Sequence, residues 1–238
     1  MAEKPILFSG PMVRAILDGR KTQTRRVIKP QPIFDADGGL WYPSHDHKRA
    51  LHYANEEHFR QGFVRDFGRY QPGDLLWVRE TWACAKYENI DGGSGWRYET
   101  LKYRADCNWG GCSGHRDGIT WNPSVHMPKW AARIWLKVKD VRVEQLQDIS
   151  EKDAQAEGVP SDGDFPMNHG FCSACNGRGL VGAVGENLGF REDECVDCDT
   201  CKKRFLNYWN FLNAKRGYGW DINPWVWVIE FRVAEANS

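Results

Sequence analysis

The sequence predicts an α+β fold in which short strands form the core and short helices flank it. Several segments alternate apolar and polar residues, which is typical of strands with one buried face, and others combine helical spacing with capping residues. Two long segments, residues 29–71 and 159–201, show neither pattern throughout and are rich in Pro, Gly, His or Cys. We therefore expect one domain over residues 1–238 with two insertions.

The N-terminal elements are predicted in the order strand, helix, strand, at residues 5–8, 10–18 and 23–28. Ser9 is a suitable N-cap, and Gly19 stands where a left-handed residue would end the helix. Side chains alternate between the two faces of a strand. Thr24 and Arg26 should therefore share one face of the second strand.

Further helices and strands are predicted along the rest of the chain from the same kinds of pattern. The first insertion contains a predicted short helix near residues 55–61. Ser150 and Asp153 resemble a capping box, and Gly158 follows after two turns, which predicts a short helix that begins after Ser150 and ends at Gly158. The other predicted elements are strands at 75–80, 101–105, 133–143 and 225–233, a hairpin loop at 92–95 and a helix at 202–214.

Composition limits the classes of function. The 32 basic and 32 acidic residues cancel, which argues against a protein whose affinity comes mainly from neutralising many phosphates. No apolar run is long enough to span a membrane, and the first residues lack the apolar core of a signal peptide. We expect a cytoplasmic protein. Most of the twelve tryptophans should be core residues, although an exposed one can stack on a base.

The turn between the predicted helix and the second strand is the strongest functional signal. It reads Gly-Arg-Lys-Thr-Gln-Thr-Arg-Arg over residues 19–26 and holds the cations Arg20, Lys21, Arg25 and Arg26. One interpretation is a solvated turn in which Glu80 pairs with Arg26. The other is a shared site formed by Lys21, Thr24, Arg26 and Glu80.

The spacing of Gly19, Lys21 and Arg26 after a capped helix resembles the ASCH domain, a PUA-like small β-barrel family linked to RNA. Three further segments are similar to members encoded in phages and prophages: residues 72–82, 127–131 and 218–227. The resemblance covers about 120 residues in three blocks and leaves both insertions unexplained. It implies a PUA-like small β-barrel with short flanking helices.

Within this superfamily, the bacterial N(4)-acetylcytidine amidohydrolases use a lysine and a threonine from this turn and a glutamate from a following strand. Lys21, Thr24 and Glu80 match that pattern. An amide hydrolase needs a nucleophile, a base and an acid. The resemblance thus implies a hydrolase in which Thr24 attacks, neutral Lys21 takes its proton and Glu80 protonates the leaving nitrogen. The pKa of Lys21 would have to fall by about three units from its usual value, which burial and nearby cations favour.

The alternative is a non-catalytic RNA-binding ASCH module. Arg20, Arg25 and Arg26 would then hold phosphates while an aromatic ring stacks on an unpaired base. The aromatic candidates to hold a pyrimidine in either case are Tyr70, Trp77 and Trp82. A modified nucleoside or RNA is the expected partner.

The second insertion carries a metal signal. Two Cys-x-x-Cys pairs, separated by 19 residues, have spacing suited to a tetrahedral zinc site: Cys172 with Cys175 and Cys195 with Cys198. The first pair opens a Cys-x-x-Cys-x-Gly-x-Gly run that resembles the zinc-binding repeats of J-domain chaperones. Cys201 is an alternative ligand because it lies within the same spacing of Cys198.

Four thiolate ligands would close the coordination sphere of such a zinc ion, so the metal is predicted to be structural, with no cofactor needed for catalysis. Cys107, Cys112 and His115 are the candidates for a second site, but they lack a clear fourth ligand. In a reducing compartment, cysteines are expected as metal ligands or free thiols in preference to disulfides.

Overall fold

The computed structural model describes residues 1–36, 39–43, 50–87, 97–107, 119–159, 180–184, 190–194 and 196–234. The helices are α1 (Gly10–Leu17), α2 (Glu56–Phe67), α3 (Glu151–Ala156) and α4 (Cys201–Asn213). The strands are β1 (Glu3–Leu7), β2 (Gln23–Val27), β3 (Ile33–Phe34), β4 (Leu40–Pro43), β5 (Ala50–Tyr53), β6 (Leu75–Arg79), β7 (Trp82–Tyr87), β8 (Arg97–Tyr103), β9 (Trp135–Gln145), β10 (Leu180–Val184), β11 (Phe190–Glu194) and β12 (Trp225–Val233). The predicted loop at residues 92–95 lies outside the described residues.

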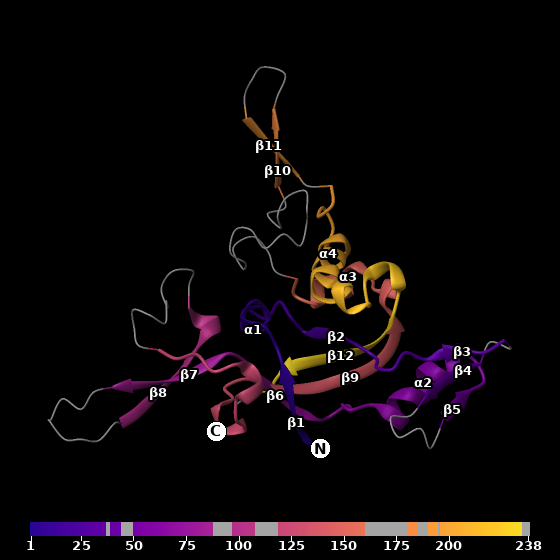
Figure 1. The fold of residues 1–238 in the computed structure, drawn as a ribbon, viewed down its shortest axis with the longest axis horizontal. Helices are drawn as coiled ribbons and strands as arrows, with labels where there is room; N and C mark the ends of the chain where they lie inside the picture. Colours follow the sequence, from indigo (N-terminus) through magenta and orange to yellow (C-terminus); the bar gives the residue numbers. More distant parts are fainter. Residues whose placement is uncertain are drawn as a thin grey trace.

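A curved five-stranded sheet forms the centre of the molecule, with the order β1-β6-β9-β12-β2 (Figure 1). β1 and β6 are parallel, and the other neighbouring pairs are antiparallel. The α+β class is therefore confirmed.

The predicted β-barrel is wrong. Among the described residues, the edge strands β1 and β2 do not pair with each other, so the sheet does not close. These two edge strands are instead joined by a side chain, since Arg26 Nη2 donates to the carbonyl oxygen of Leu7 at 2.6 Å. One guanidinium takes the place of a ladder of backbone hydrogen bonds. An open seam therefore remains between β1 and β2.

Helix α1 packs across the sheet as its apolar spacing predicts. Val13 and Ile16 are buried in one cluster with Val78 of β6 and Ile229 of β12. The predicted end of the helix is confirmed, because Gly19 has a left-handed φ of 73°. The chain then turns directly into β2 (Figure 1).

The segment from residue 29 to residue 71 is more ordered than an excursion with one short helix. It contains the sheet β3-β4-β5 and the 12-residue helix α2. Phe59 and Phe63 of α2 are fully buried, and their rings lie 4.9 Å from those of Trp225 and Trp227, respectively. These aromatic contacts make the segment part of the protein core.

Helices α3 and α4 cover the opposite face of β12 (Figure 1). Alternation in β12 predicts one apolar face, but Val226 and Val228 on the other face are also fully buried. They pack with Phe205 and Trp209 of α4. Helices pack against both faces of β12, so apolar residues on both faces are buried.

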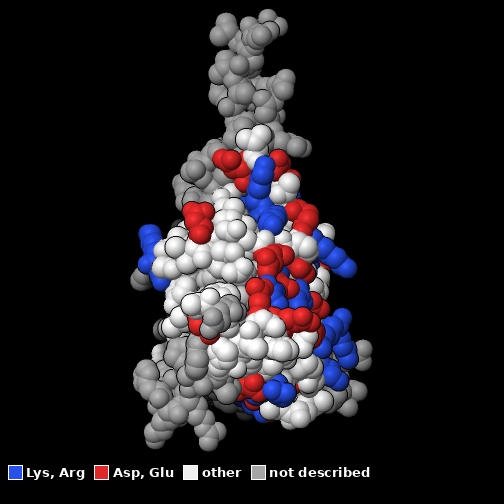
Figure 2. All heavy atoms as spheres, turned by 90° about the vertical axis from the view of Figure 1, so that its right-hand side faces the viewer, with Lys and Arg blue, Asp and Glu red and all other residues white. Residues whose placement is uncertain are grey.

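Charge is distributed without a dominant sign on the face shown in Figure 2, where acidic and basic side chains intermix. Within the described residues, no helix is long and apolar enough to cross a membrane.

Candidate functional site

The basic turn is held between the ends of two helices. The backbone N–H of Lys21 donates to the carbonyl oxygen of Ala15 in α1, at 2.9 Å. The next N–H, of Thr22, donates to the carbonyl oxygen of Ala156 in α3, also at 2.9 Å. The turn is therefore fixed on both sides by backbone groups.

Gly158 allows α3 to approach the turn this closely. Its φ is +61°, and a Cβ atom built there would lie 2.6 Å from Lys21 Cβ and 3.0 Å from Lys21 Cα. Such distances are shorter than van der Waals contact. A residue with a side chain at position 158 would push the lysine out of place.

The amine of Lys21 is buried and surrounded by acceptors. Lys21 is 3% exposed, and its Nζ donates to Gln23 O at 2.8 Å, to Glu157 O at 2.7 Å and to Glu157 Oε2 at 3.0 Å. Burial lowers the pKa of Lys21, and nearby Arg25 and Arg26 act in the same direction, whereas Glu157 opposes the change. The net lowering agrees in direction with the need for a neutral amine.

Glu157 is the carboxylate that sequence reasoning missed. It follows the last residue of α3 and is 5% exposed. A carboxylate at a helix C-terminus meets the negative end of the helix dipole, so it is locally unfavourable. An acidic residue directly before Gly158 was a signal that a cation compensates it, although nothing local identifies Lys21 as that cation.

Arg25 joins Glu157 to a wider buried network. Its guanidinium contacts Glu157 Oε1 at 3.2 Å, Glu144 Oε2 at 3.0 Å and Asp153 Oδ2 at 3.6 Å, and it also donates to Gln23 Oε1. Arg25 is 4% exposed. Through these contacts Arg25 helps to hold the carboxylate of Glu157 beside Lys21.

Lys21 and Thr24 line one cavity of about 410 Å³, here called the lysine–threonine pocket. Within the described residues, the Thr24 side chain has no hydrogen-bond partner, although Thr24 is only 4% exposed. The pocket lies between β1, β2 and α4. Its basic residues are Lys21, Arg25, Arg26, Lys29 and Arg216, and its aromatic residues are Phe8, Phe205, Tyr208 and Trp209.

A second cavity of about 510 Å³, here called the arginine pocket, opens at the seam between β1 and β2. Both strands line it, and its basic residues are Arg26, Lys29, Arg69 and Arg79. No aspartate or glutamate is among its described lining residues. The two pockets share Leu7, Arg26, Val27 and Lys29.

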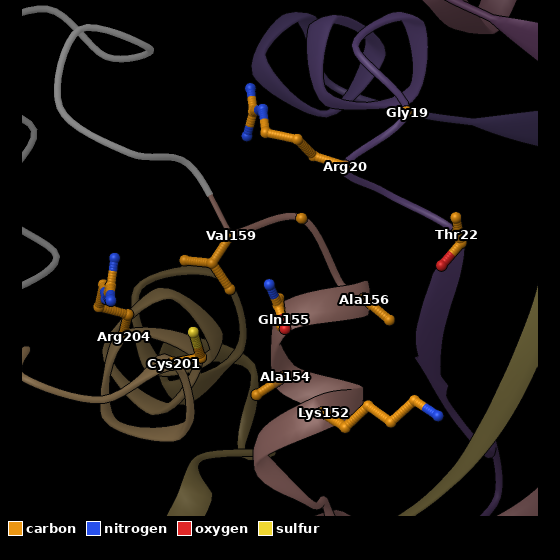
Figure 3. A pocket seen from close by; sticks show the side chains of 11 residues that line it. Gly19, Arg20, Thr22, Lys152, Ala154, Gln155, Ala156, Val159, Cys201 and Arg204 are labelled. Carbon is orange, nitrogen blue, oxygen red and sulfur yellow. The ribbon is translucent and has the colours of Figure 1, made fainter.

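Arg20 does not join the predicted group in either pocket. It lines a third cavity of about 570 Å³, between the turn, α3 and α4, together with Thr22, Lys152 and Arg204 (Figure 3). Its guanidinium also pairs with Asp18, at 3.0 Å. The structure therefore separates Arg20 from Lys21 and Thr24.

Glu80 also lies apart from the Lys21–Glu157 pair. Its two carboxylate oxygens accept from Arg133 Nε at 2.9 Å and from Arg133 Nη2 at 3.0 Å. Burial raises the pKa of Glu80, while Arg133 opposes the rise. Within the described residues, Glu80 makes no hydrogen bond with Lys21 or Thr24 and lines neither of their pockets. The structure therefore separates Glu80 from Lys21 and Thr24, beside which sequence reasoning expected it to act as an acid.

The three predicted aromatic residues occupy different places. Tyr70 lines the arginine pocket, and its hydroxyl donates to Pro5 O at 2.9 Å. Trp77 is buried beneath the guanidinium of Arg79. Trp82 packs with Met127 and Ala131 in a separate apolar cluster. Of the three, only Tyr70 lines one of the two pockets described above.

Comparison with known proteins gives little information about this chain. No protein-family description matches it, and no curated protein is similar to it. A crystal structure of an ASCH domain from Lactobacillus crispatus JV V101 aligns with a TM-score of 0.35 and 10% identity. That alignment covers 98% of this chain and 79% of the ASCH domain.

The cysteine predictions fall mainly outside the described residues, namely Cys112, His115, Cys172, Cys175 and Cys195. Cys198 and Cys201 are described, and Asn207 Nδ2 donates to Cys198 Sγ at 3.6 Å. The described residues contain no group of three or more His, Cys, Asp or Glu side chains that could hold a metal ion. Cys107 is disulfide-bonded, which differs from the expectation of free thiols or metal ligands.

Proposed function

We propose that this protein hydrolyses the amide that links an acyl group to the exocyclic nitrogen of cytidine or a related nucleoside. The sequence resemblance to ASCH-type amidohydrolases suggests the reaction. The observation that carries the proposal is the buried Lys21–Glu157 pair, since Lys21 lines the same pocket as Thr24 and its Nζ lies 3.0 Å from Glu157 Oε2. We assign to Glu157 the role that the sequence resemblance gives to Glu80.

Burial prepares Lys21 to act as a base. An amine accepts a proton only when it is neutral, and desolvation favours the neutral form. The carboxylate of Glu157 is placed to take the lysine proton and to return it later. The pair thus supplies both a base and a proton reservoir.

In the first step, Thr24 Oγ1 forms a bond to the acyl carbon, and its proton passes to Lys21 Nζ. The carbon–nitrogen bond then breaks, and the exocyclic nitrogen of cytosine takes a proton from the Lys21–Glu157 pair. Water hydrolyses the resulting threonine ester by the reverse proton transfers. Cytidine and a carboxylic acid are released, and the Thr24 hydroxyl is restored.

The direct test is to incubate the protein with N(4)-acetylcytidine and follow the ultraviolet change as cytidine forms. Thr24→Ala and Lys21→Arg should each reduce turnover by several orders of magnitude, because one removes the nucleophile and the other cannot become neutral. Glu157→Gln should reduce turnover far more than Glu80→Gln. Absence of hydrolysis by the wild type would refute the activity, and equal losses in the two glutamine variants would refute the assignment of Glu157.

A second candidate function is a non-catalytic RNA-binding module. It is favoured by the basic residues of the arginine pocket, which have no carboxylate facing them among the described lining residues. A binder should lose RNA affinity with Lys21→Ala and with added salt, and it should tolerate Thr24→Ala. Turnover of N(4)-acetylcytidine separates the two functions.

We also propose a structural zinc ion in the second insertion. The ligands would be Cys172, Cys175, Cys195 and Cys198, with Cys201 as the alternative to Cys198. Four thiolates leave no open coordination position, so the ion would stabilise the insertion and take no part in hydrolysis.

A further inference from the structure

The arginine pocket concentrates positive charge that the protein itself does not neutralise. Arg26, Lys29, Arg69 and Arg79 line it, and none of the four makes an ion pair within the described part of the chain. By contrast, Arg25 on the other side of β2 contacts three carboxylates. The chain has 32 acidic residues, yet none of those described forms an ion pair with the four cations around this cavity. Such a cavity favours an anionic ligand.

Aromatic rings hold several of these cations in place without cancelling their charge. The guanidinium of Arg79 lies 4.6 Å from the centroid of the Trp77 ring, and that of Arg69 lies 5.5 Å from the Tyr70 ring. The Nε atom of Arg79 is buried and has no hydrogen-bond partner among the described residues. The contact with the Trp77 ring therefore holds this arginine, and no hydrogen bond through Nε does so.

The arginine pocket and the lysine–threonine pocket are neighbours along β2, because they share lining residues that include Arg26. A ligand that places its acyl group at Thr24 can therefore extend past Arg26. The part that enters the arginine pocket meets basic groups and the ring of Tyr70.

We propose that the arginine pocket binds a phosphate group of the substrate, so that the acylated cytosine is carried by a nucleotide or an RNA strand. This inference rests on the proposed function, which places the acyl group beside Thr24. Phosphate is the favoured anion because guanidinium groups bind its oxygens through paired hydrogen bonds, and because it lies one sugar away from the base. The seam left open between β1 and β2 is thus the entrance for the phosphate.

The test measures binding, so that it does not depend on catalysis. Calorimetric titrations would compare cytidine, cytidine 5′-monophosphate and a short single-stranded RNA that contains one cytidine. Cytidine 5′-monophosphate should bind at least about tenfold more tightly than cytidine, because hydrogen bonds to charged groups are worth that much. Added salt should reduce this preference.

The variants locate the phosphate. Arg79→Gln and Arg69→Gln should each reduce the preference for the phosphorylated ligand, and Arg69 is exposed, so its replacement should not impair folding. Arg232→Gln is the matched control, because Arg232 is also exposed, lies on β12 and lines neither pocket. It makes the same change in net charge.

Equal affinity for the mononucleotide and the RNA would show that the substrate is a mononucleotide. A further gain in affinity of about tenfold with RNA would show that the substrate is an RNA strand. Both results support a phosphate subsite. The inference is overturned if cytidine 5′-monophosphate and RNA bind no more tightly than cytidine, or if neither pocket variant differs from Arg232→Gln. Failure of hydrolysis with a retained phosphate preference would refute the proposed function alone.

Discussion

Replacing Glu157 by glutamine tests the buried ion pair at the centre of the site. The change keeps the shape of the side chain and removes its negative charge. Lys21 and Arg25, which are 3% and 4% exposed, would both lose their contact with this carboxylate. Arg25 retains Glu144 and Asp153, whereas Lys21 keeps no carboxylate partner within the described residues and is left with neutral oxygen acceptors.

The expected loss in the free energy of unfolding is about 3 kcal/mol, at the lower end of the range for breaking a buried ion pair, because glutamine still accepts a hydrogen bond. For a chain of this length each kcal/mol lowers the Tm by roughly 2–4 °C, so the Tm should fall by about 6–12 °C. Chemical denaturation followed by tryptophan fluorescence gives the free energy directly.

The loss should depend on pH in a defined direction. Burial already lowers the pKa of Lys21, and Glu157 opposes that change, so the glutamine variant should have a still lower lysine pKa. Between the folded and the unfolded pKa of this lysine, the unfolded chain binds more protons, and the free energy of unfolding therefore rises with pH. This rise begins at a lower pH in the variant than in the wild type, so the defect of Glu157→Gln should shrink with rising pH between the two folded pKa values of Lys21, below the usual lysine pKa of about 10.4.

Glu144→Gln is the matched control. Glu144 pairs with Arg25 and Arg142, and arginine side chains do not lose their protons in this range. Its defect should therefore be independent of pH. A Glu157→Gln protein that is as stable as the wild type, or whose defect does not change with pH, would refute the role given to the pair.

Three further predictions test other parts of the structure. Gly158→Ala should lower the free energy of unfolding by at least about 1–2 kcal/mol, because alanine is strained at positive φ and its Cβ meets Lys21; an unchanged Tm would contradict this. Phe63→Ala should cost about 3–5 kcal/mol in chemical denaturation, because its ring is fully buried; a loss below 1 kcal/mol would show that α2 is not part of the core. Elemental analysis of protein prepared without chelator should find about one zinc per chain, and Cys172→Ser should abolish it; metal-free wild-type protein would exclude the site.

The sequence by itself determined the elements whose causes are local. Ser150 and Asp153 form the predicted cap of α3, since the Asp153 N–H donates to Ser150 Oγ at 3.1 Å. Gly19 takes the predicted left-handed conformation, and the turn at residues 72–74, with the sequence Pro-Gly-Asp, leads into β6 at Leu75. Each of these depends on residues within a few positions of one another, so spacing alone reveals it.

The tertiary structure decided which groups meet. Lys21 and Glu157 are 136 positions apart, and Glu80 and Arg133 are 53 apart, so neither pairing leaves a periodic trace in the sequence. The open seam between β1 and β2 is equally non-local, because it depends on whether two edge strands approach closely enough to share backbone hydrogen bonds. Local sequence therefore marked the turn with Lys21 and Thr24 as a candidate site. Only the packing of α3 and the curvature of the sheet made Glu157 the carboxylate partner of Lys21 and formed the arginine pocket.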